Sequence, residues 1–295
     1  MRFSSPGGGL STFSIVAYAP RKEEWGVAVQ SKFLAAAAVV SWAQAKAGAV
    51  ATQAWANASY GPEGLRLLQQ GFSAEEVVKR LIEADEGRGH RQVGVVDSQG
   101  GAFAFTGSEC LPWAGHMVGE GYTCQGNILV GEETLGAMAK AFEETEGELA
   151  DRLVASLLAG QEAGGDSRGQ QSAGLLVVRE KGGYGGFSDR SVDLRVDDHP
   201  SPILELKRLL ELHKLYFGET DPAKLVKIEG PVVRELQEIV KQAGQHDGPL
   251  SGVYNEATKA ALQRLVGIEN LEERWREDEY IDEVVLEFLR EKFGG

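Results

Sequence analysis

The order of the predicted elements restricts the fold of this chain more than any other feature. Strand-like segments come in clusters, and a pair of helix-like segments separates each cluster from the next. A parallel βαβ sheet needs single helices that alternate with single strands, so this order argues against a Rossmann-type fold. It favours antiparallel sheets that are stacked face to face and covered by helices. We therefore predict an α+β fold, a four-layer αββα sandwich, for the larger part of the chain.

The first cluster begins with a predicted hairpin. Its segments, 12–19 and 25–33, are rich in β-branched and aromatic residues with alternating character, and Pro20 marks the turn between them. Ser73 followed by Glu76 is a capping box, which predicts the start of a helix. Similar patterns predict the other elements: strands at 49–55, 92–97, 102–106, 122–130, 172–178 and 192–196, and helices at 59–70, 73–84, 132–144, 148–162 and 202–216.

The last quarter of the chain reads as a separate unit. The segment 218–222 combines Gly, Asp and Pro and predicts a domain boundary, so we expect two domains, at 12–217 and 222–295. The second domain shows helical spacing at 231–243, 255–266 and 278–293. We therefore predict a small three-helix domain after the sandwich.

Composition excludes several classes of function. The net charge is −14 and the sequence contains no cluster of Lys and Arg, which argues against binding to nucleic acid. The longest apolar run is too short to span a bilayer, and the first residues lack the apolar segment of a secretion signal. We expect a cytoplasmic protein without membrane contact. Cys110 and Cys124 lack zinc-type spacing, so two reduced thiols are the simplest interpretation, and a disulfide stays possible.

Thr12 is the first candidate for chemistry, because its hydroxyl group lies at the head of the first predicted strand. If Thr12 were the terminal residue, its α-amine, with an ordinary pKa near 8, could accept the hydroxyl proton. Residues 1–11 precede it, so this mechanism requires that they be absent or removed. A start at Leu10 would instead make Ser11 terminal after trimming of the initiator methionine.

Three further residues could support such a nucleophile. Lys46 leads into the third strand, where a lysine could lower the pKa of the nucleophile, and a surface position is the alternative interpretation. Gln53 and Asn57 around the same strand carry amides that could stabilise an oxyanion. An Asn after a buried strand is as often a capping residue.

The histidines do not point to a metal site. His90 and His116 are candidate site residues, although a single His in a loop is more often structural. The segment 197–199, Asp-Asp-His, could ligate a metal but is more typical of a turn, so we predict no metal and no cofactor. The G-x-S-x-G elbow of serine hydrolases is absent, and neither Cys has a protease-like context.

Taken together, residues 12 to about 217 resemble a bacterial family called domain of unknown function 1028, which is classed in the N-terminal-nucleophile hydrolase superfamily. Nine stretches match in type and order: Thr12-Phe-Ser-Ile-Val-Ala17, Gly26-Val-Ala-Val-Gln-Ser-Lys-Phe33, Gly48-Ala-Val-Ala-Thr-Gln-Ala54, Tyr60-Gly-Pro-Glu-Gly64, His90-Arg-Gln92, Pro112-Trp-Ala-Gly-His116, Gln125-Gly-Asn127, Gly165-Asp-Ser-Arg-Gly-Gln-Gln-Ser-Ala173 and Val192-Asp-Leu-Arg-Val-Asp-Asp-His-Pro200.

The resemblance implies the four-layer sandwich of that superfamily and a site around Thr12. It places Gln30 where proteasome-type subunits hold a catalytic Asp, and an amide at that position is a departure from their pattern. It places Lys46 near their essential lysine and Asp166 in their supporting loop. Asn57 or Asn127 would supply oxyanion donation. The remaining candidates for substrate binding are Gln30, Gln53, His90, His116 and Ser172.

The tail resembles the putative peptidoglycan-binding helical domain, through Val233-Arg-Glu-Leu-Gln237, Asp247-Gly-Pro-Leu-Ser-Gly-Val-Tyr254 and Ala257-Thr-Lys-Ala-Ala-Leu-Gln263. The sequence thus predicts an amide-bond hydrolase that acts on a small amide or a peptide. The alternative is a non-catalytic binding protein on the same fold. The tail would bind peptidoglycan fragments or a protein partner, and we expect a homo-oligomer.

Overall fold

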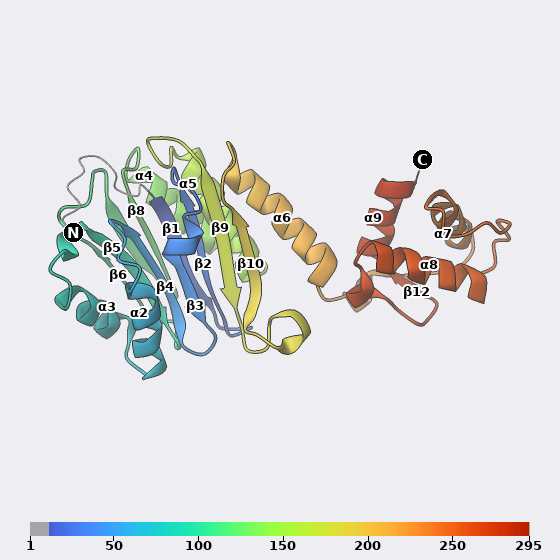
Figure 1. Ribbon diagram of the computed structural model, residues 1–295, viewed down its shortest axis with the longest axis horizontal. Coiled ribbons are helices and arrows are strands. Elements are labelled where there is room, and N and C mark those ends of the chain that lie inside the picture. The colour runs from blue at the N-terminus through green and yellow to red at the C-terminus, as the bar shows by residue number, and fades with distance from the viewer. Residues whose placement is uncertain (1–11, 295) are drawn as a thin grey trace. The chain divides into compact units, whose positions relative to one another are not determined.

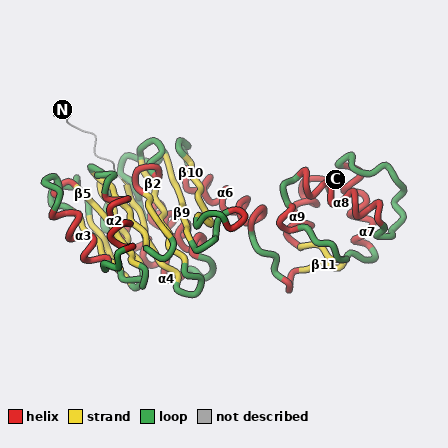
Figure 2. Tube along the Cα trace, turned by 60° about the horizontal axis from the view of Figure 1, so that its bottom comes forward, coloured by secondary structure: helices red, strands yellow, loops and turns green. Residues whose placement is uncertain are grey.

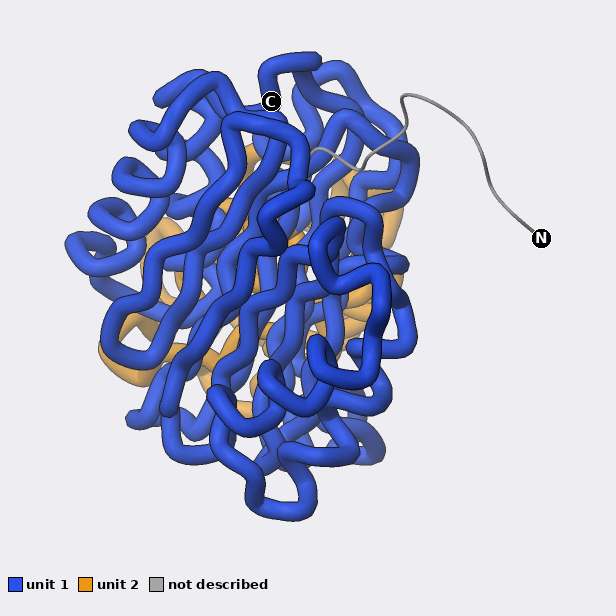
Figure 3. Tube along the Cα trace, turned by 90° about the vertical axis from the view of Figure 1, so that its left-hand side faces the viewer, with its two compact units in different colours: residues 1–209 blue, residues 210–295 orange. Residues whose placement is uncertain are grey.

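The computed structural model describes residues 12–294, and the chain divides into two compact units, 1–209 and 210–295 (Figure 3). The boundary falls within α6 (Pro202–Phe217), whereas the sequence places it after this helix. The first unit is a mixed α+β structure with antiparallel sheets, and the second is mainly helical (Figures 1 and 2). This confirms the predicted class of the fold.

The larger sheet of the first unit has six strands in the order β10-β9-β2-β1-β8-β7, and every neighbouring pair is antiparallel. The predicted hairpin at the start of the described chain forms its centre. The strands are β1 (Thr12–Ala19), β2 (Glu24–Ser31), β7 (Gly115–Gly119), β8 (Tyr122–Asn127), β9 (Ser172–Val178) and β10 (Arg190–Val196).

The smaller sheet has four antiparallel strands in chain order. They are β3 (Ser41–Gln44), which follows the short helix α1 (Ala37–Val40), then β4 (Gly48–Ala54), β5 (Arg91–Asp97) and β6 (Ala102–Thr106). The sequence did not predict β3 or β7. Short 3₁₀ helices complete the connections: Arg88–His90, Tyr184–Gly186, Pro222–Lys224 and Glu272–Arg274.

The two sheets pack face to face through small and β-branched residues. Val16, Val27 and Val29 of the larger sheet share one buried cluster with Ala49 and Ala51 of the smaller sheet. Period-2 alternation directs these side chains inward and their sequence neighbours outward. The outer faces of the stacked sheets carry helices (Figure 1).

The helices on the smaller sheet are α2 (Tyr60–Gln69) and α3 (Ala74–Glu83), and those on the larger sheet are α4 (Glu133–Glu144) and α5 (Leu149–Glu162). The predicted capping box at the start of α3 is confirmed: the backbone N–H of Glu76 donates to Ser73 Oγ, and that of Ser73 donates to the Glu76 carboxylate. Between 12 and 294, no helix is long and apolar enough to cross a lipid bilayer.

The second unit contains the three predicted helices, α7 (Pro231–Gln242), α8 (Glu256–Ile268) and α9 (Glu283–Phe293). Leu236, Leu262 and Leu286 form the centre of its apolar core. A two-stranded sheet of β11 (Leu225–Lys227) and β12 (Tyr280–Asp282), which the sequence did not predict, also belongs to this unit. Its buried ion pair joins Arg274 to Asp282, with Nη1 2.5 Å from Oδ2.

Candidate functional site

A row of polar side chains crosses the larger sheet at the end where β1 begins. Thr12 pairs with Asn127 of β8 on one side and with Ser31 of β2 on the other, and Ser31 pairs with Ser172 of β9. Directly paired residues in an antiparallel sheet point to the same face. All four side chains are buried. Three hydroxyl groups and an amide therefore lie side by side on the face that meets the smaller sheet.

Thr12 lies in the centre of this row. Its Oγ1 donates a hydrogen bond to Ser31 Oγ at 3.2 Å, and its carbonyl oxygen accepts one from Gln53 Nε2 at 3.3 Å. Gln53 belongs to β4, so the smaller sheet holds the backbone of Thr12 from across the sandwich. Gln53, a candidate oxyanion donor, thus contacts the backbone of Thr12.

Gln53 begins a network of buried amides between the two sheets. Its Oε1 accepts from Ser14 Oγ at 2.6 Å, and Ser14 Oγ in turn accepts from Gln125 Nε2 at 2.7 Å. Gly94 on β5 leaves space for the side chain of Gln125, because a Cβ atom at position 94 would lie 2.1 Å from Gln125 Oε1. Buried amides are favourable only when their polar atoms are hydrogen-bonded, so these contacts fix the geometry behind Thr12.

Gln92 on β5 is the centre of the network. Its Oε1 accepts from Gln53 Nε2 at 2.8 Å and from Asn127 Nδ2 at 3.1 Å. Its Nε2 donates to Thr106 Oγ1, and Thr106 Oγ1 lies 2.9 Å from His116 Nδ1. Partial burial lowers the pKa of the His116 imidazole. A continuous chain of hydrogen bonds thus links the partly exposed His116 to Asn127, beside Thr12.

The loop around Asp166 closes the site from the side of β2. Asp166 is buried, and its Oδ2 accepts from the backbone N–H of Lys32 at 2.9 Å, directly after Ser31. Its Oδ1 accepts from the backbone N–H of Arg168 at 2.9 Å. The carboxylate therefore anchors its loop to the end of β2.

Comparison with known proteins identifies the first unit. The model of the family described as "Family of unknown function (DUF1028)" matches residues 12–206. The chain belongs to this family. It is also similar to the crystal structure of protein SPO2555 from Silicibacter pomeroyi, which carries the same family model, with 33% identity and a TM-score of 0.65. That match covers 71% of this chain and 88% of the other.

The second unit has a match of its own. A family model described as "Putative peptidoglycan binding domain" matches residues 216–289. Among curated proteins, none matches the chain. The comparisons therefore divide the chain into two domains: a DUF1028 domain and a peptidoglycan-binding-type helical domain.

The position of Lys46 in the DUF1028 domain corrects one expectation. Lys46 lies in the turn between β3 and β4, where its Nζ pairs with Glu180 Oε2 at 2.6 Å and both side chains are exposed. Gln53, which contacts Thr12, lies seven residues after Lys46, and most of these seven residues belong to β4. This strand rises about 3.3 Å per residue, so Lys46 lies roughly 20 Å from the row, at the other end of the sheet.

Gln30 also differs from its expected position beside a substrate. It pairs with Phe13, one step along β2 from Ser31, so its side chain points to the opposite face of the sheet, toward the helices. There it is fully buried, and within residues 12–294 neither polar atom of its amide has a hydrogen-bond partner.

Two other predicted residues, Asn57 and His90, have local structural contacts. Asn57 Oδ1 accepts from the backbone N–H of Ser59 at 3.1 Å, and its Nδ2 donates to Asp85, so it stabilises the turn before α2. His90 pairs with Glu109 at 2.9 Å on the surface.

Ser172 shares the row with Thr12, but its hydroxyl stabilises the segment after β2. It donates to the carbonyl of Phe33 at 2.6 Å and accepts from the N–H of Ala36 at 3.1 Å. Cys110 and Cys124 carry free thiols. Across the part of the chain that the structure describes, no three His, Cys, Asp or Glu side chains gather as metal ligands would.

Sequence reasoning missed Ser14, Ser31, Gln92 and Gln125 as members of the site. A signal for them was present, since each is a polar residue at a position that alternation assigns to the buried face of a strand. The leader residues 1–11, on which the chemistry of Thr12 depends, lie outside the described residues.

Proposed function

We propose that the DUF1028 domain hydrolyses an amide bond, with Thr12 Oγ1 as the nucleophile and the α-amine of a terminal Thr12 as the base. The proposal rests on one observation: Thr12 lies at the head of a central strand, in a row with Ser31 and Asn127 and in contact with Gln53. The helices on both outer faces of stacked antiparallel sheets support an N-terminal-nucleophile type of sandwich.

The chemistry requires removal of residues 1–11, because an amide nitrogen cannot accept a proton at neutral pH. The freed amine takes the proton of Thr12 Oγ1, and the oxygen attacks the substrate carbonyl carbon. The tetrahedral intermediate then collapses with cleavage of the C–N bond, and the ammonium group returns the proton to the leaving amine. Water hydrolyses the resulting ester by the same proton transfers and regenerates Thr12.

The other residues of the row have positioning roles in this proposal. Ser31 orients the hydroxyl of Thr12 through the 3.2 Å contact. Asn127 is the amide beside Thr12 and would stabilise the oxyanion, and Gln92 holds its Nδ2 through the 3.1 Å hydrogen bond. Lys46 and Asn57 have no part in the proposed mechanism, since their contacts lie elsewhere.

Covalent labelling tests the proposal without knowledge of the natural substrate. A chain that begins at Thr12 is incubated with a p-nitrophenyl ester, and its intact mass is followed over time. We expect one acyl group per chain, mapped by peptide analysis to Thr12, and no adduct in Thr12→Ala. Acylation of Thr12→Ala at the same rate would contradict the proposal.

A second proposal concerns the tail, which would bind peptidoglycan fragments. The loop 247–254 is held by Gln237, whose Oε1 accepts from the N–H of Gly252 and whose Nε2 donates to the carbonyl of Val253. This loop presents Leu250 and Val253, which are 38% and 59% exposed. Cosedimentation with insoluble peptidoglycan tests the proposal. We expect the unmodified chain to sediment with peptidoglycan and Val253→Ser to sediment less. Equal recovery of both proteins with and without peptidoglycan would contradict the proposal.

A further inference from the structure

Large apolar side chains are exposed at the end of the sandwich where Thr12 lies. β2 and β8 pair with β1 on either side in the antiparallel sense, so both strands end where β1 begins. β4 ends there too, because Gln53 near its end contacts Thr12. The segments that follow these three strands, and the connection between β6 and β7, carry large apolar side chains that are between 39% and 62% exposed. They are Phe33, Leu34, Trp55, Leu111 and Val130, and we call them the apolar rim.

Hydrogen bonds to the backbone hold the apolar rim next to the row that contains Thr12. The N–H of Trp55 donates to the carbonyl of His90 at 3.2 Å, and the carbonyl of Trp55 accepts from Arg91 Nη1 at 2.5 Å. Ser172 Oγ, a member of the row, donates to the carbonyl of Phe33 at 2.6 Å. Single exposed apolar residues are common on protein surfaces, whereas a group of them at one place marks a binding surface.

The backbone is strained where the site meets the apolar rim. Ala54 directly follows Gln53 and has a φ of 67°, and Ile128 directly follows Asn127 and has a φ of 53°. Residues with a Cβ atom rarely adopt this left-handed conformation, and β-branched residues do so least. The N–H of Ile128 donates to the carbonyl of Leu111 at 3.1 Å, so the strained segment also holds the rim. Strain of this kind persists where the surrounding structure enforces it, commonly at ligand-binding sites.

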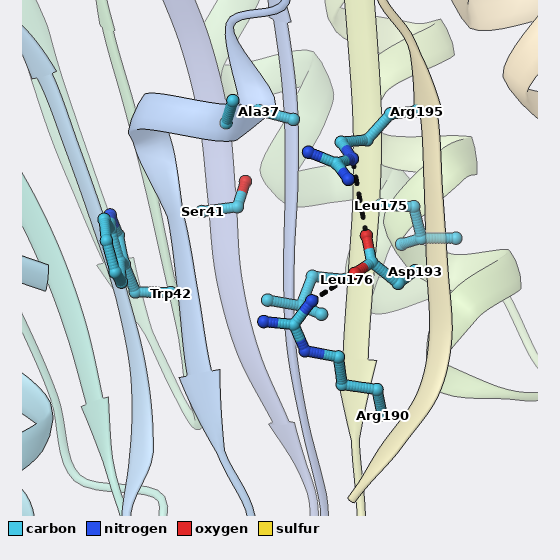
Figure 4. A pocket seen from close by; sticks show the side chains of 9 residues that line it. Ala37, Ser41, Trp42, Leu175, Leu176, Arg190, Asp193 and Arg195 are labelled. Atoms are coloured by element: carbon cyan, nitrogen blue, oxygen red, sulfur yellow. Dashed lines mark hydrogen bonds and ion pairs between the residues drawn. The ribbon is translucent and has the colours of Figure 1, made fainter. Parts of the chain in front are cut away.

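A hollow elsewhere in the same unit is less suited to an apolar group of the substrate. It has a volume of about 180 Å³ and is lined by residues of β3, β9 and β10. The Asp193 carboxylate already lies between Arg190 and Arg195 there (Figure 4). Leu176 in its wall lies four residues along β9 from Ser172, or about 13 Å. A group bound in this hollow would therefore lie away from the row.

We infer that the apolar rim binds the acyl group of the substrate, which makes the substrate an amide of an apolar, medium-chain carboxylic acid such as hexanoic acid. The inference rests on the proposed hydrolysis at Thr12. Phe33 lies two residues after Ser31, and Trp55 lies two residues after Gln53, so about 7 Å of extended chain separates the row from the rim. An acyl chain of a few carbon atoms spans this distance.

The acyl group is the part of an amide for which such a rim is most useful. It stays on the nucleophile through both steps of the reaction, whereas the amine leaves after the first. Binding of an unreactive part of the substrate can orient the carbon atom that reacts. The rim contains no charged side chain, so a charged substituent would lose its hydration there without gaining a partner.

Acylation rates with two p-nitrophenyl esters test the inference. The hexanoate and acetate esters share the leaving group and differ only in the acyl group. A chain that begins at Thr12 is incubated with each ester, and its intact mass over time gives the rate of acylation. We expect the hexanoate ester to react at least about tenfold faster, because each methylene group that the rim buries stabilises the complex. Equal rates, or a faster reaction with acetate, would overturn the inference.

Two variants show whether this preference comes from the apolar rim. Trp55→Ser should lower the rate with the hexanoate ester at least about fivefold more than the rate with the acetate ester. Phe187→Ser is the matched control, because Phe187 is 94% exposed and follows β9 at the opposite end of the sandwich. It should leave both rates unchanged. An equal loss with both esters in Trp55→Ser, or the same change of preference in both variants, would overturn the inference.

A binding measurement separates this inference from the proposed hydrolysis. The chain that begins at position 12, with Thr12→Ala, is titrated with hexanamide and with acetamide, and saturation-transfer NMR detects the bound amide. Hexanamide should bind at least about tenfold more tightly. No saturation of hexanamide, or equal affinities for the two amides, would overturn the rim as an acyl site. Tighter binding of hexanamide without acylation of Thr12 by either ester would support the rim and contradict the hydrolysis.

Discussion

The hydroxyl group of Thr12 donates a hydrogen bond to the hydroxyl group of Ser31, and the two oxygen atoms lie 3.2 Å apart. The two residues are cross-strand partners at the end of the central hairpin. Their contact fixes where the Thr12 oxygen points before any substrate arrives, which is the positioning that a nucleophile requires.

Removal of the Ser31 hydroxyl should therefore slow acylation of a terminal Thr12. We expect Ser31→Ala to lower the rate about 10- to 100-fold, because the nucleophile loses its orienting contact. Ser156→Ala is the matched control, since Ser156 is also buried but bonds to the carbonyl of Met138 in the helical layer. Equal rates for Ser31→Ala and the unmodified chain in the mass assay would contradict this role.

Gln92→Ala should destabilise the DUF1028 domain. The substitution removes the acceptor that the amides of Gln53 and Asn127 share, together with the donor to Thr106, so we expect a loss of about 2–4 kcal/mol in the free energy of unfolding. Gln99→Ala, at an exposed position, should change it by less than about 0.5 kcal/mol. Urea denaturation of the three proteins measures both values, and similar values for the two variants would refute the role of the network.

Gly94→Ala should disturb the same network by a steric route. Its added methyl group would lie 2.1 Å from Gln125 Oε1 and 2.4 Å from Thr123 Oγ1, both in the buried interface between the sheets. We expect a loss of about 1–3 kcal/mol. Gly136→Ala, where no atom lies within 4 Å in helix α4, should instead gain up to about 1 kcal/mol. Thermal unfolding compares the pair, and a loss in Gly136→Ala would contradict the packing described here.

Asp85 should make folding stability depend on pH on the acid side. The guanidinium group of Arg91, 2.8 Å away, and the hydrogen bonds of Asn57, Gly87 and Tyr60 hold the pKa of Asp85 well below its ordinary value. A lowered pKa in the folded state stabilises the protein above the unfolded-state pKa of about 4, and this stability is lost as the pH falls further.

Asp85→Asn should therefore be less stable than the unmodified protein at pH 7, by about 1–3 kcal/mol. The difference in stability between the two proteins should shrink as the pH falls below about 4, because the ionised Asp85 carboxylate then stabilises the folded state progressively less. Urea denaturation at pH 7 and at acid pH measures the two differences. A difference that stays constant over this range would contradict the assigned pKa shift.

Some strands could be predicted from the sequence and others could not, for physical reasons. The alternation in 12–19 and 25–33 predicted the central hairpin, whereas β3 follows a continuous apolar run from Phe33, whose pattern does not distinguish helix from strand. β7 is short and both begins and ends with a glycine, Gly115 and Gly119, and glycines are typical of loops.

Within the row, the sequence indicated Thr12 through its place at the head of the first strand, whereas Asn127 was indicated only by the family resemblance. Lys46 and Gln30 were misplaced for two different reasons. The sequence does not reveal which end of β4 approaches Thr12, and a shift of one residue in a strand moves a side chain to the other face of the sheet. Those two facts depend on strand register, which only the tertiary structure supplies.

The central claim is that Thr12 acts as a nucleophile once its amine is free. The most direct measurement is the hydrolysis rate for a panel of amino-acid p-nitroanilides and primary amides, with three proteins: a chain that begins at Thr12, the same chain with Thr12→Ala, and the chain that retains residues 1–11. We predict turnover by the first protein alone. Turnover of the same amide at equal rates by all three proteins would contradict the account.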